Sequence, residues 1–377
     1  MAAHRPADGR FTVGVSRDFL DAEGRNVWGD IRMGELDAAG IDWHYLPRDT
    51  GELLPADIDG LDAVLFAGPS VTARTFAGAG RPPLLLARFG VGYDAVDLDA
   101  CTEHGVLVTI TPDGARRPVA TAALTLLLAV LQNVAVKDRL VREGRWAERE
   151  RWMGLGLTGR RVGLLGLGNT ARDLVGLLRP FEVEVVAHDP YCPPETAAEL
   201  GVRLADADTV MAESDAVIVM CVLTEETLHL VDARRLSLMK RSAVLLNVAR
   251  GPIVDEAALI EALREGRLRG AGLDVFESEP PDPGNPLLSM DNVVLSPHSL
   301  AWTDEMSTGN GGSAVRAVLD VAAGRPPRFV VNRDVLGHPR LSERLGELAV
   351  NEGQLNDGQL DEGLFGEGQV TDSEART

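Results

Sequence analysis

The chain contains little lysine, little cysteine and few aromatic residues. Only two of its 37 basic residues are lysines, and aromatic side chains make up 5% of its 377 residues. Its three cysteines, Cys101, Cys192 and Cys221, are scattered and form no Cys-x-x-Cys pair. This spacing argues against a disulfide framework and favours free thiols in a reducing compartment. We predict no metal site.

Long apolar runs are also scarce. The longest, residues 120–136, is interrupted by Thr125, Gln132 and Asn133, and a membrane-spanning helix needs about 20 apolar residues. Residues 1–10 are polar and lack the apolar centre of a signal peptide. The net charge of −20 opposes binding to nucleic acid or to an anionic membrane. We therefore expect a cytoplasmic protein that binds neither nucleic acid nor membranes, with residues 120–136 in a buried helix.

The length of 377 residues favours two domains. In the first region, two helices are predicted at 31–39 and 97–104, between some of the strands. The predicted strands are five short apolar runs, at 11–16, 43–46, 63–67, 84–87 and 107–110. This alternation predicts an α/β domain with a parallel sheet.

A second alternating region follows a long helix that is predicted at 118–144. Its six predicted strands lie around Val162 and Val183 and at 216–220, 244–247, 271–274 and 293–295. Six strands joined by helical crossovers are typical of a doubly wound sheet. The predicted fold class is therefore α/β, with two Rossmann-like doubly wound parallel-sheet domains.

The end of the chain has two parts. A helix predicted at 303–323 has no strand of the second domain left to serve, so we expect it to pack on the first. Residues 1–111 and 299–339 would then form one discontinuous, flavodoxin-like domain, and residues 112–298 the other. Residues 340–377 are acidic and rich in glycine, and Asn351-Glu352-Gly353-Gln354-Leu355 is loosely repeated in the next five residues. This composition predicts a disordered tail.

The most informative motif is Gly166-Leu167-Gly168-Asn169-Thr170-Ala171. An apolar run precedes it, a helical stretch and a second apolar run follow it, and Asp189 lies 23 positions after the first glycine. This is the layout of a dinucleotide-binding βαβ unit. A glycine motif alone would also fit a plain structural turn, but these flanking features favour cofactor binding.

Each residue of the motif suits that interpretation. Gly166 permits the tight turn, Gly168 lets the backbone approach a pyrophosphate, and Ala171 allows the helix to pack closely on the strand. The helix N-terminus offers N–H groups to the phosphates. Asp189 would accept hydrogen bonds from the ribose hydroxyls and repel a 2′-phosphate, so NAD is favoured over NADP.

Polar residues also follow three later strands, at the edge where a dinucleotide fold places its chemistry. Arg250 follows 244–247, Asp274 and Glu279 follow the next strand, and His298 follows the last. An arginine suits bidentate binding of a carboxylate, and a histidine held by a carboxylate suits proton transfer. Singly, each residue also fits a surface ion pair or a structural histidine. With a hydride carrier, the set fits interconversion of a keto acid and a hydroxy acid.

With these motifs the sequence resembles the D-isomer-specific 2-hydroxyacid dehydrogenases, the phosphoglycerate dehydrogenase-like enzymes, over residues 11–332. The resemblance implies NAD as cofactor, a 2-oxo or 2-hydroxy acid as substrate, and a homodimer formed through the NAD-binding domain. It also implies that residues 1–111 and 299–339 form the substrate domain.

The resemblance assigns roles to individual residues. Gly90-Val91-Gly92-Tyr93-Asp94 is similar to the family's substrate loop, in which the N–H groups of Val91 and Gly92 hold the substrate carboxylate. Arg250 matches the substrate-binding arginine, Glu279 the carboxylate that orients the histidine, and His298 the catalytic acid and base. The implied cofactor contacts are Gly166, Gly168, Asn169, Thr170, Asp189, Val248, Ala249 and Asp274, of which Asp274 lies beside the nicotinamide.

Two other functions fit the same fold. Formate and phosphite dehydrogenases belong to the same superfamily, but phosphite oxidation there uses a lysine near the substrate loop, and this chain has no lysine before Lys137. An NAD-sensing corepressor, a scaffold that keeps the catalytic residues, is the second alternative. Activity measurements separate these functions.

Arg116 and Arg117 open the predicted helix at 118–144, where two adjacent cations are unfavourable. Ordinary surface pairing would offset their charge. The alternative hypothesis is a second anionic group on the substrate.

Overall fold

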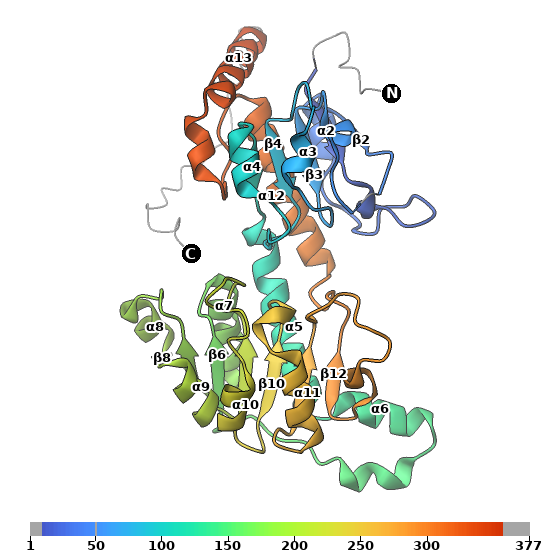
Figure 1. Ribbon diagram of the computed structural model, residues 1–377, viewed down its shortest axis with the longest axis vertical. Helices are drawn as coiled ribbons and strands as arrows, with labels where there is room; N and C mark the ends of the chain where they lie inside the picture. The colour runs from blue at the N-terminus through green and yellow to red at the C-terminus, as the bar shows by residue number, and fades with distance from the viewer. Residues whose placement is uncertain (1–9, 50, 357–377) are drawn as a thin grey trace. The chain divides into compact units, whose positions relative to one another are not determined.

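The structure is a computed structural model that describes residues 10–49 and 51–356, with side chains up to Val350. The chain divides into two compact units. Unit 1 contains the described residues up to Ala115 and from Thr303 onward, and unit 2 is Arg116–Trp302. The chain thus leaves unit 1 once and returns to it. In Figure 1, unit 1 accordingly contains both blue segments from early in the chain and orange segments from late in the chain.

Unit 1 is built on a parallel sheet with the strand order β2-β1-β3-β4-β5. The strands are β1 (Thr12–Val15), β2 (Asp42–Tyr45), β3 (Ala63–Phe66), β4 (Leu85–Arg88) and β5 (Leu107–Thr109). All five coincide with predicted strands. Four of them, β1, β3, β4 and β5, are short, mainly apolar runs that are almost fully buried, whereas the edge strand β2 is partly exposed. The order is that of a flavodoxin-like doubly wound sheet, which confirms the predicted fold class.

Helices cover both faces of this sheet. One core contains Val15, Leu65 and Leu85, and the other contains the alternate strand residues Val64 and Leu86, because successive side chains of a strand point to opposite faces. The helical segments are η1 (Arg17–Phe19), α1 (Gly34–Ala38), α2 (Pro55–Ile58), α3 (Ala73–Phe76), α4 (Leu98–Glu103), α12 (Asp304–Ala322), η6 (Arg333–Gly337) and α13 (Pro339–Asn356).

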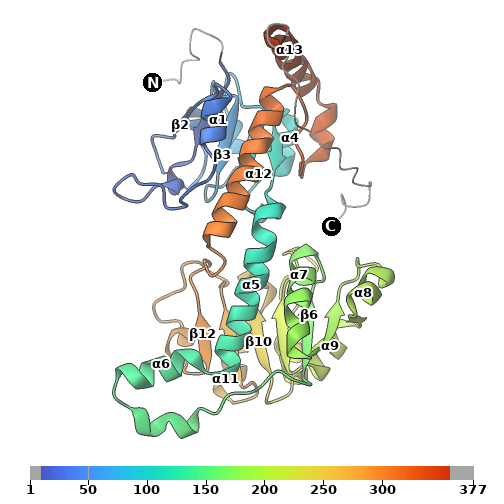
Figure 2. The same cartoon turned by 180° about the vertical axis from the view of Figure 1, so that it is seen from behind.

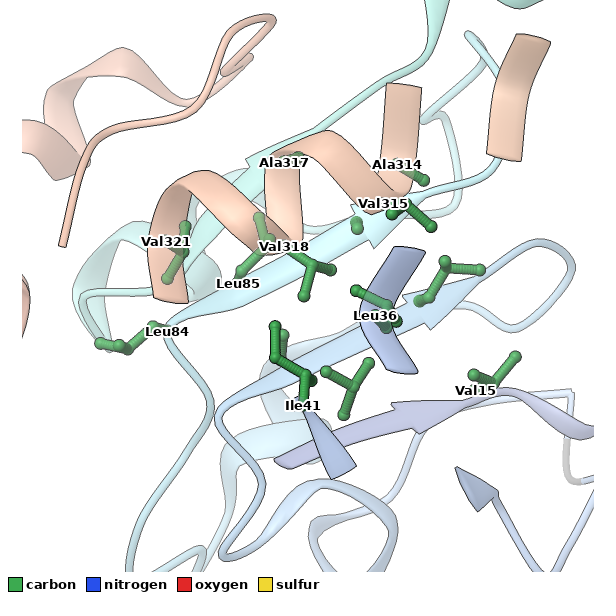
Figure 3. Close-up of a cluster of buried hydrophobic side chains, with 14 of the residues drawn as sticks. Val15, Leu36, Ile41, Leu84, Leu85, Ala314, Val315, Ala317, Val318 and Val321 are labelled. Carbon is green, nitrogen blue, oxygen red and sulfur yellow. The ribbon is translucent and has the colours of Figure 1, made fainter. Parts of the chain in front are cut away.

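Helix α12 completes the first of these cores. Its Ala314, Val315 and Val318 are buried against β4 and α1, and Figure 3 shows them directed toward Leu85 and Leu36. Figure 2 shows the helix lying along the sheet. The prediction that this segment packs back on the first region is confirmed.

Unit 2 contains a parallel sheet in the order β12-β11-β10-β9-β6-β7-β8. Its strands are β6 (Arg161–Leu165), β7 (Glu184–His188), β8 (Arg203–Leu204), β9 (Ala216–Val219), β10 (Val244–Asn247), β11 (Gly270–Leu273) and β12 (Val293–Leu295). Six of them correspond to predicted strands, and β8 was missed because two residues are too few to show a pattern. Strand order reverses between β6 and β9, which is where doubly wound sheets bind their ligands.

Helices also cover both faces of the unit 2 sheet. Helices α9, α10 and α11 pack on one face (Figure 1), and α5, α7 and α8 pack on the other (Figure 2). The helical segments are α5 (Pro112–Leu131), α6 (Val134–Arg142), η2 (Trp146–Arg151), α7 (Asn169–Leu178), η3 (Arg179–Phe181), α8 (Pro194–Leu200), α9 (Ala207–Glu213), α10 (Ala233–Leu238), η4 (Gly251–Ile253), α11 (Glu256–Arg264) and η5 (Pro286–Ser289).

The prediction of one helix over 118–144 is wrong. The structure has α5 and α6 instead, separated at Asn133, whose φ of 54° is left-handed and stops the first helix. Among the described residues, α5 is also the one helix that is long and apolar enough to cross a membrane, by length and composition alone, and 56% of its most apolar window is buried. Its Leu126, Leu127 and Leu131 lie in a core of unit 2, as expected for a core helix.

The unit boundaries lie slightly beyond the expected positions 111/112 and 298/299. The first turn of α5 remains with unit 1 because Gly114 lies directly against α12, where an added Cβ would be 2.1 Å from the backbone N of Asn310. The chain returns to unit 1 at Thr303, whose hydroxyl caps α12 by accepting from the N–H of Met306 at 3.1 Å.

The predicted disorder from residue 340 is also wrong for the first part of that segment, which forms α13. Leu341 and Leu345 are buried in a core of unit 1 and Leu348 packs beside them. This spacing of four and three residues is a helical stripe, which the glycine-rich repeat further on obscured. Residues 357–377 of the predicted tail lie outside the described residues.

Arginines fix α13 at the N-terminal edge of the unit 1 sheet. Arg344 donates to the buried Asp62 at 2.7 Å, and Arg340 donates to the carbonyls of Pro82 and of His104. Burial lowers the pKa of Arg340 to about 10, so it stays charged at neutral pH. Helix α13 is therefore an integral part of unit 1.

A chain that ends at Gly337 is expected to unfold more easily than the full chain. Loss of two buried leucines removes about 3–6 kcal/mol of burial free energy, which lowers the melting temperature on the order of 10 °C. A chain that ends at Asn356, which keeps α13, is the control and should melt close to the full chain. Equal melting temperatures of the two truncated chains in calorimetry would contradict this role of α13.

Candidate active site

The glycine turn between β6 and α7 has one closely packed glycine and one open one. Gly166 has a φ of +99°, and an added Cβ would be 2.7 Å from the backbone N of Cys221. Only glycine adopts this conformation without strain and leaves room for the neighbouring loop. At Gly168, by contrast, an added Cβ would meet no protein atom within 4 Å. The space beside Gly168 is therefore open to a ligand.

Helix α7 begins directly at this open side. Its first hydrogen bond joins the N–H of Arg172 to the carbonyl of Gly168. Within the described part of the chain, the N–H groups of Asn169 and Thr170 have no acceptor. A helix start with unsatisfied N–H groups and a positive dipole end binds phosphate groups. This set of donors fits a dinucleotide pyrophosphate.

Asp189, at the end of β7, is fixed by the backbone of the turn. One carboxylate oxygen accepts from the N–H of Leu167 at 2.7 Å, and the other accepts from the N–H of Tyr191 at 2.9 Å. Each oxygen keeps a second lone pair, so the carboxylate can also accept from ribose hydroxyls. The Tyr191 hydroxyl donates to Glu226 at 3.0 Å, and this hydrogen bond raises the tyrosine pKa. Two carboxylates therefore lie at the ribose end of the candidate dinucleotide site.

Cys221 lies behind Gly166 but is not a nucleophile. Burial raises the pKa of its thiol to about 11, so the thiol stays protonated at neutral pH and lacks the thiolate that reactive cysteines need.

Arg250 follows β10 in a loop that Asn247 organises. The buried Asn247 side chain accepts from the N–H of Ala249 at 3.0 Å and donates to the carbonyl of Arg250 at 2.8 Å. The Arg250 guanidinium donates to the carbonyl of Ala249 at 2.7 Å. Asn247, the one polar residue of an otherwise apolar strand, thus fixes the conformation of the loop that carries Val248 and Ala249.

Gly251 brings this loop against the turn that follows β11. An added Cβ at Gly251 would be 1.8 Å from the carbonyl oxygen of Phe276, so no larger residue fits without moving one of the two loops. Sequence reasoning assigned no role to Asn247 or Gly251. A polar residue ending a buried strand is a signal for the first, whereas a contact between distant loops leaves no local signal for the second.

His298 and Glu279 form the pair that the sequence predicts. The histidine Nδ1 lies 2.7 Å from Glu279 Oε2, and Glu279 Oε1 accepts from the N–H of Phe276 at 3.0 Å. Both side chains are partly exposed, 46% for the histidine and 37% for the glutamate. With Nδ1 donating to the carboxylate, Nε2 is the nitrogen that exchanges a proton.

Asp274 holds the backbone beneath this histidine. Its Oδ1 accepts from the N–H groups of Ser299 and Leu300 at 3.1 and 3.2 Å, and its carbonyl accepts from the N–H of His298 at 2.7 Å. His298 has a φ of +53°, which is uncommon for residues other than glycine. Asp274 therefore stabilises an unusual backbone conformation at the candidate acid.

The predicted substrate loop lies in unit 1, after β4. The carbonyl of Gly92 accepts from Arg88 Nε at 2.9 Å, and the N–H of Gly90 donates to the Thr111 hydroxyl at 2.8 Å. No described residue accepts a hydrogen bond from the N–H of Val91 or Gly92. These two adjacent donors can bind an anion.

The structure thus gathers the predicted residues in two groups. In unit 2, all of them follow the carboxyl ends of parallel strands and share one sheet edge. Val91 and Gly92 belong to unit 1.

Arg116 and Arg117 pair with Asp173 of α7, at 2.7 and 3.8 Å. Asp173 thus supplies one carboxylate to the two guanidinium groups, which is ordinary pairing within the chain, and the second anionic group on the substrate stays a hypothesis.

No group of three or more histidine, cysteine, aspartate or glutamate side chains in the described residues is arranged to hold a metal ion.

Comparison with known proteins identifies the family. Residues 124–299 match the family described as D-isomer specific 2-hydroxyacid dehydrogenase, NAD binding domain. The glyoxylate reductase of Thermococcus onnurineus is 36% identical over 301 residues, which cover 78% of this chain and 89% of that protein. The chain belongs to the D-isomer-specific 2-hydroxyacid dehydrogenase family. The residues that match this family's NAD-binding domain all lie in unit 2.

Two further similarities define the extent of the match. The D-3-phosphoglycerate dehydrogenase of Archaeoglobus fulgidus is 40% identical over 248 residues, which cover 66% of this chain and 47% of that protein. The chain spans about half the length of the phosphoglycerate dehydrogenases that it matches. A solved structure of a Thermus thermophilus protein has a TM-score of 0.76 and 32% identity, and the match covers 85% of this chain and all of that one.

The two glycines of the turn are expected to respond differently to alanine. Gly166→Ala should lower the melting temperature by several degrees, because the left-handed conformation costs about 1–2 kcal/mol and the Cβ meets the next loop. Gly168→Ala should melt like the wild type but bind NADH at least about tenfold more weakly, because the methyl group occupies the space where the pyrophosphate lies. Calorimetry and a titration of NADH fluorescence measure the two effects. A Gly168→Ala variant with unchanged NADH affinity would place the pyrophosphate elsewhere.

Proposed function

We propose that this protein is an NAD-dependent oxidoreductase that interconverts a 2-oxo acid and a D-2-hydroxy acid, working in the reductive direction. The observation that carries this proposal is the hydrogen-bonded pair of His298 and Glu279, held at the same sheet edge as Arg250 in an NAD-binding domain of the family. Relatives named glyoxylate reductase support a small 2-oxo acid as the substrate.

Each residue then has a defined task. Bound NADH supplies the hydride that reduces C2 of the substrate. Arg250 binds the substrate carboxylate with two parallel N–H bonds. His298 gives the proton from Nε2 to the substrate oxygen, while Glu279 keeps the protonated ring in place.

Charge develops on the substrate oxygen during reduction. The Arg250 guanidinium and the protonated His298 ring are both positive and stabilise that charge. General acid catalysis by a positioned side chain contributes about 10²–10⁴-fold to the rate. The carboxylates nearby have other tasks, since Asp274 holds the turn after His298 and Glu279 holds the ring.

We also propose that the protein is cytoplasmic and forms a homodimer through its NAD-binding domain. The α6–η2 region of unit 2 carries large apolar side chains with high exposure: Val134 at 51%, Val141 at 59%, Trp146 at 63% and Met153 at 81%. Exposed apolar side chains gathered in one region support a contact with a second copy. Sedimentation of the full chain checks this, and a monomer at micromolar concentration would contradict it.

NADH oxidation with a panel of 2-oxo acids tests the proposed reaction. The wild type is expected to oxidise NADH with at least one of them, and His298→Asn should lose at least about 10²-fold in kcat because the proton donor is removed. The NADH dissociation constant should stay within about twofold, since His298 does not form the dinucleotide site. More than a tenth of wild-type kcat in this variant would contradict the acid role.

Asp189 is expected to set the cofactor preference. The wild type should prefer NADH to NADPH, because the carboxylates of Asp189 and Glu226 repel a 2′-phosphate. Asp189→Asn keeps the size of the side chain and removes its charge, so the ratio of kcat/KM for NADPH to that for NADH should rise by about tenfold or more, as expected when 1.4 kcal/mol of repulsion is lost. Equal use of both cofactors by the wild type would show that Asp189 does not discriminate between them.

A further inference from the structure

A second histidine–carboxylate pair lies at the same edge of the unit 2 sheet. His229 Nε2 lies 2.6 Å from Glu277 Oε1. The histidine belongs to the loop after β9 and the glutamate to the turn after β11. The proposed reaction assigns no task to either residue.

The backbone of His229 joins the loop after β9 to the loop after β10. Its N–H donates to the carbonyl of Pro252 at 2.9 Å, and Val231 pairs with Val254 as in a parallel strand. His229 has a φ of +49°, an uncommon conformation for a residue other than glycine. Such conformations persist when the surrounding contacts enforce them. Pro252 lies two residues after Arg250, in the same loop.

Glu277 lies in the turn that carries the orienting carboxylate, Glu279. Its N–H donates to Glu256 at 3.1 Å, and the adjoining carbonyl of Phe276 lies against Gly251. Glu279 follows two residues later and itself accepts from the N–H of Phe276. A displacement of Glu277 would therefore move the turn that places Glu279.

We propose that His229 and Glu277 are positioning residues. Their contact clamps the loops after β9, β10 and β11 together, so that the side chains of Arg250 and Glu279 stay in the positions that the reaction needs. The inference rests on the proposed function, because it concerns the placement of these two residues for that reaction. Side-chain exposures of 47% and 35% mean that the pair contributes little to global stability. Its effect should appear in catalysis, where small misplacements reduce rates strongly.

His229→Gly is the main test. Glycine adopts positive φ without strain, so this variant keeps the backbone conformation and removes only the imidazole. Glu277→Ala removes the other partner. Both variants should lower kcat about tenfold and raise KM for the 2-oxo acid, with the NADH dissociation constant and the melting temperature close to those of the wild type. The double variant should be no worse than the single ones, because the two residues act through one contact.

Glu182→Gly is the matched control. Glu182 also has a positive φ, of 55°, but lies just before β7, at the opposite edge of the same sheet. Its replacement should leave kcat unchanged. A similar loss of kcat in this control would overturn the inference, because the effect would then follow from any glycine introduced at such a position.

Hydrogen exchange gives a measurement that does not depend on activity. Amides of residues 276–279 should exchange about tenfold faster in His229→Gly and Glu277→Ala than in the wild type and in Glu182→Gly. The clamp is overturned if hydrogen exchange and kcat are both unchanged in His229→Gly and Glu277→Ala. The proposed function still holds in that case, provided that His298→Asn inactivates the enzyme. If the wild type reduces no 2-oxo acid, the proposed function fails, and exchange at 276–279 still supports or overturns the clamp.

Discussion

The loops at the catalytic edge of unit 2 touch one another through their backbones, and the arrangement of the site depends on this contact. Gly166 lies against the backbone of Cys221, and Gly251 lies against the carbonyl of Phe276. Side chains at these two positions would separate the glycine turn from the loop after β9, and Arg250 from the turn of Glu279. Because parallel strands end at the same edge, the sheet brings the loops near one another, and the glycines allow them to meet.

Carboxylates fix the site by accepting hydrogen bonds from backbone N–H groups. Asp189 accepts from Leu167, Asp274 from Ser299, and Glu279 from Phe276. Such charge-assisted hydrogen bonds are stronger than neutral ones. Each acid therefore has its position set by backbone N–H groups before a ligand arrives, so less of the binding free energy is needed to order the site.

The sequence predicted most of the strands and the order of the chemistry along the chain. Apolar runs bounded by polar residues identify buried parallel strands such as β3 and β10, and the chemistry of Arg250, Glu279 and His298 follows from their position after such strands. The features that the sequence did not predict depend on long-range contacts. The need for glycine at position 251 is evident only from its contact with the turn at Phe276. Helix α13 is stabilised by a core whose other residues are far away in sequence. The break at Asn133 depends on a backbone conformation that a helical apolar pattern does not reveal.

The return of the chain to unit 1 through α12 has a consequence for synthesis on the ribosome. Unit 2 is contiguous, so it can fold as soon as it emerges, whereas Leu85 of β4 is covered only when α12 has been made. One apolar face of an early sheet must therefore remain exposed while nearly two hundred further residues are translated, as Arg116–Trp302 lies between the two parts of unit 1. Exposed sheet faces of this kind are prone to aggregation. Translation speed and chaperone binding therefore affect the folding of the unit 1 sheet more than the folding of the unit 2 sheet.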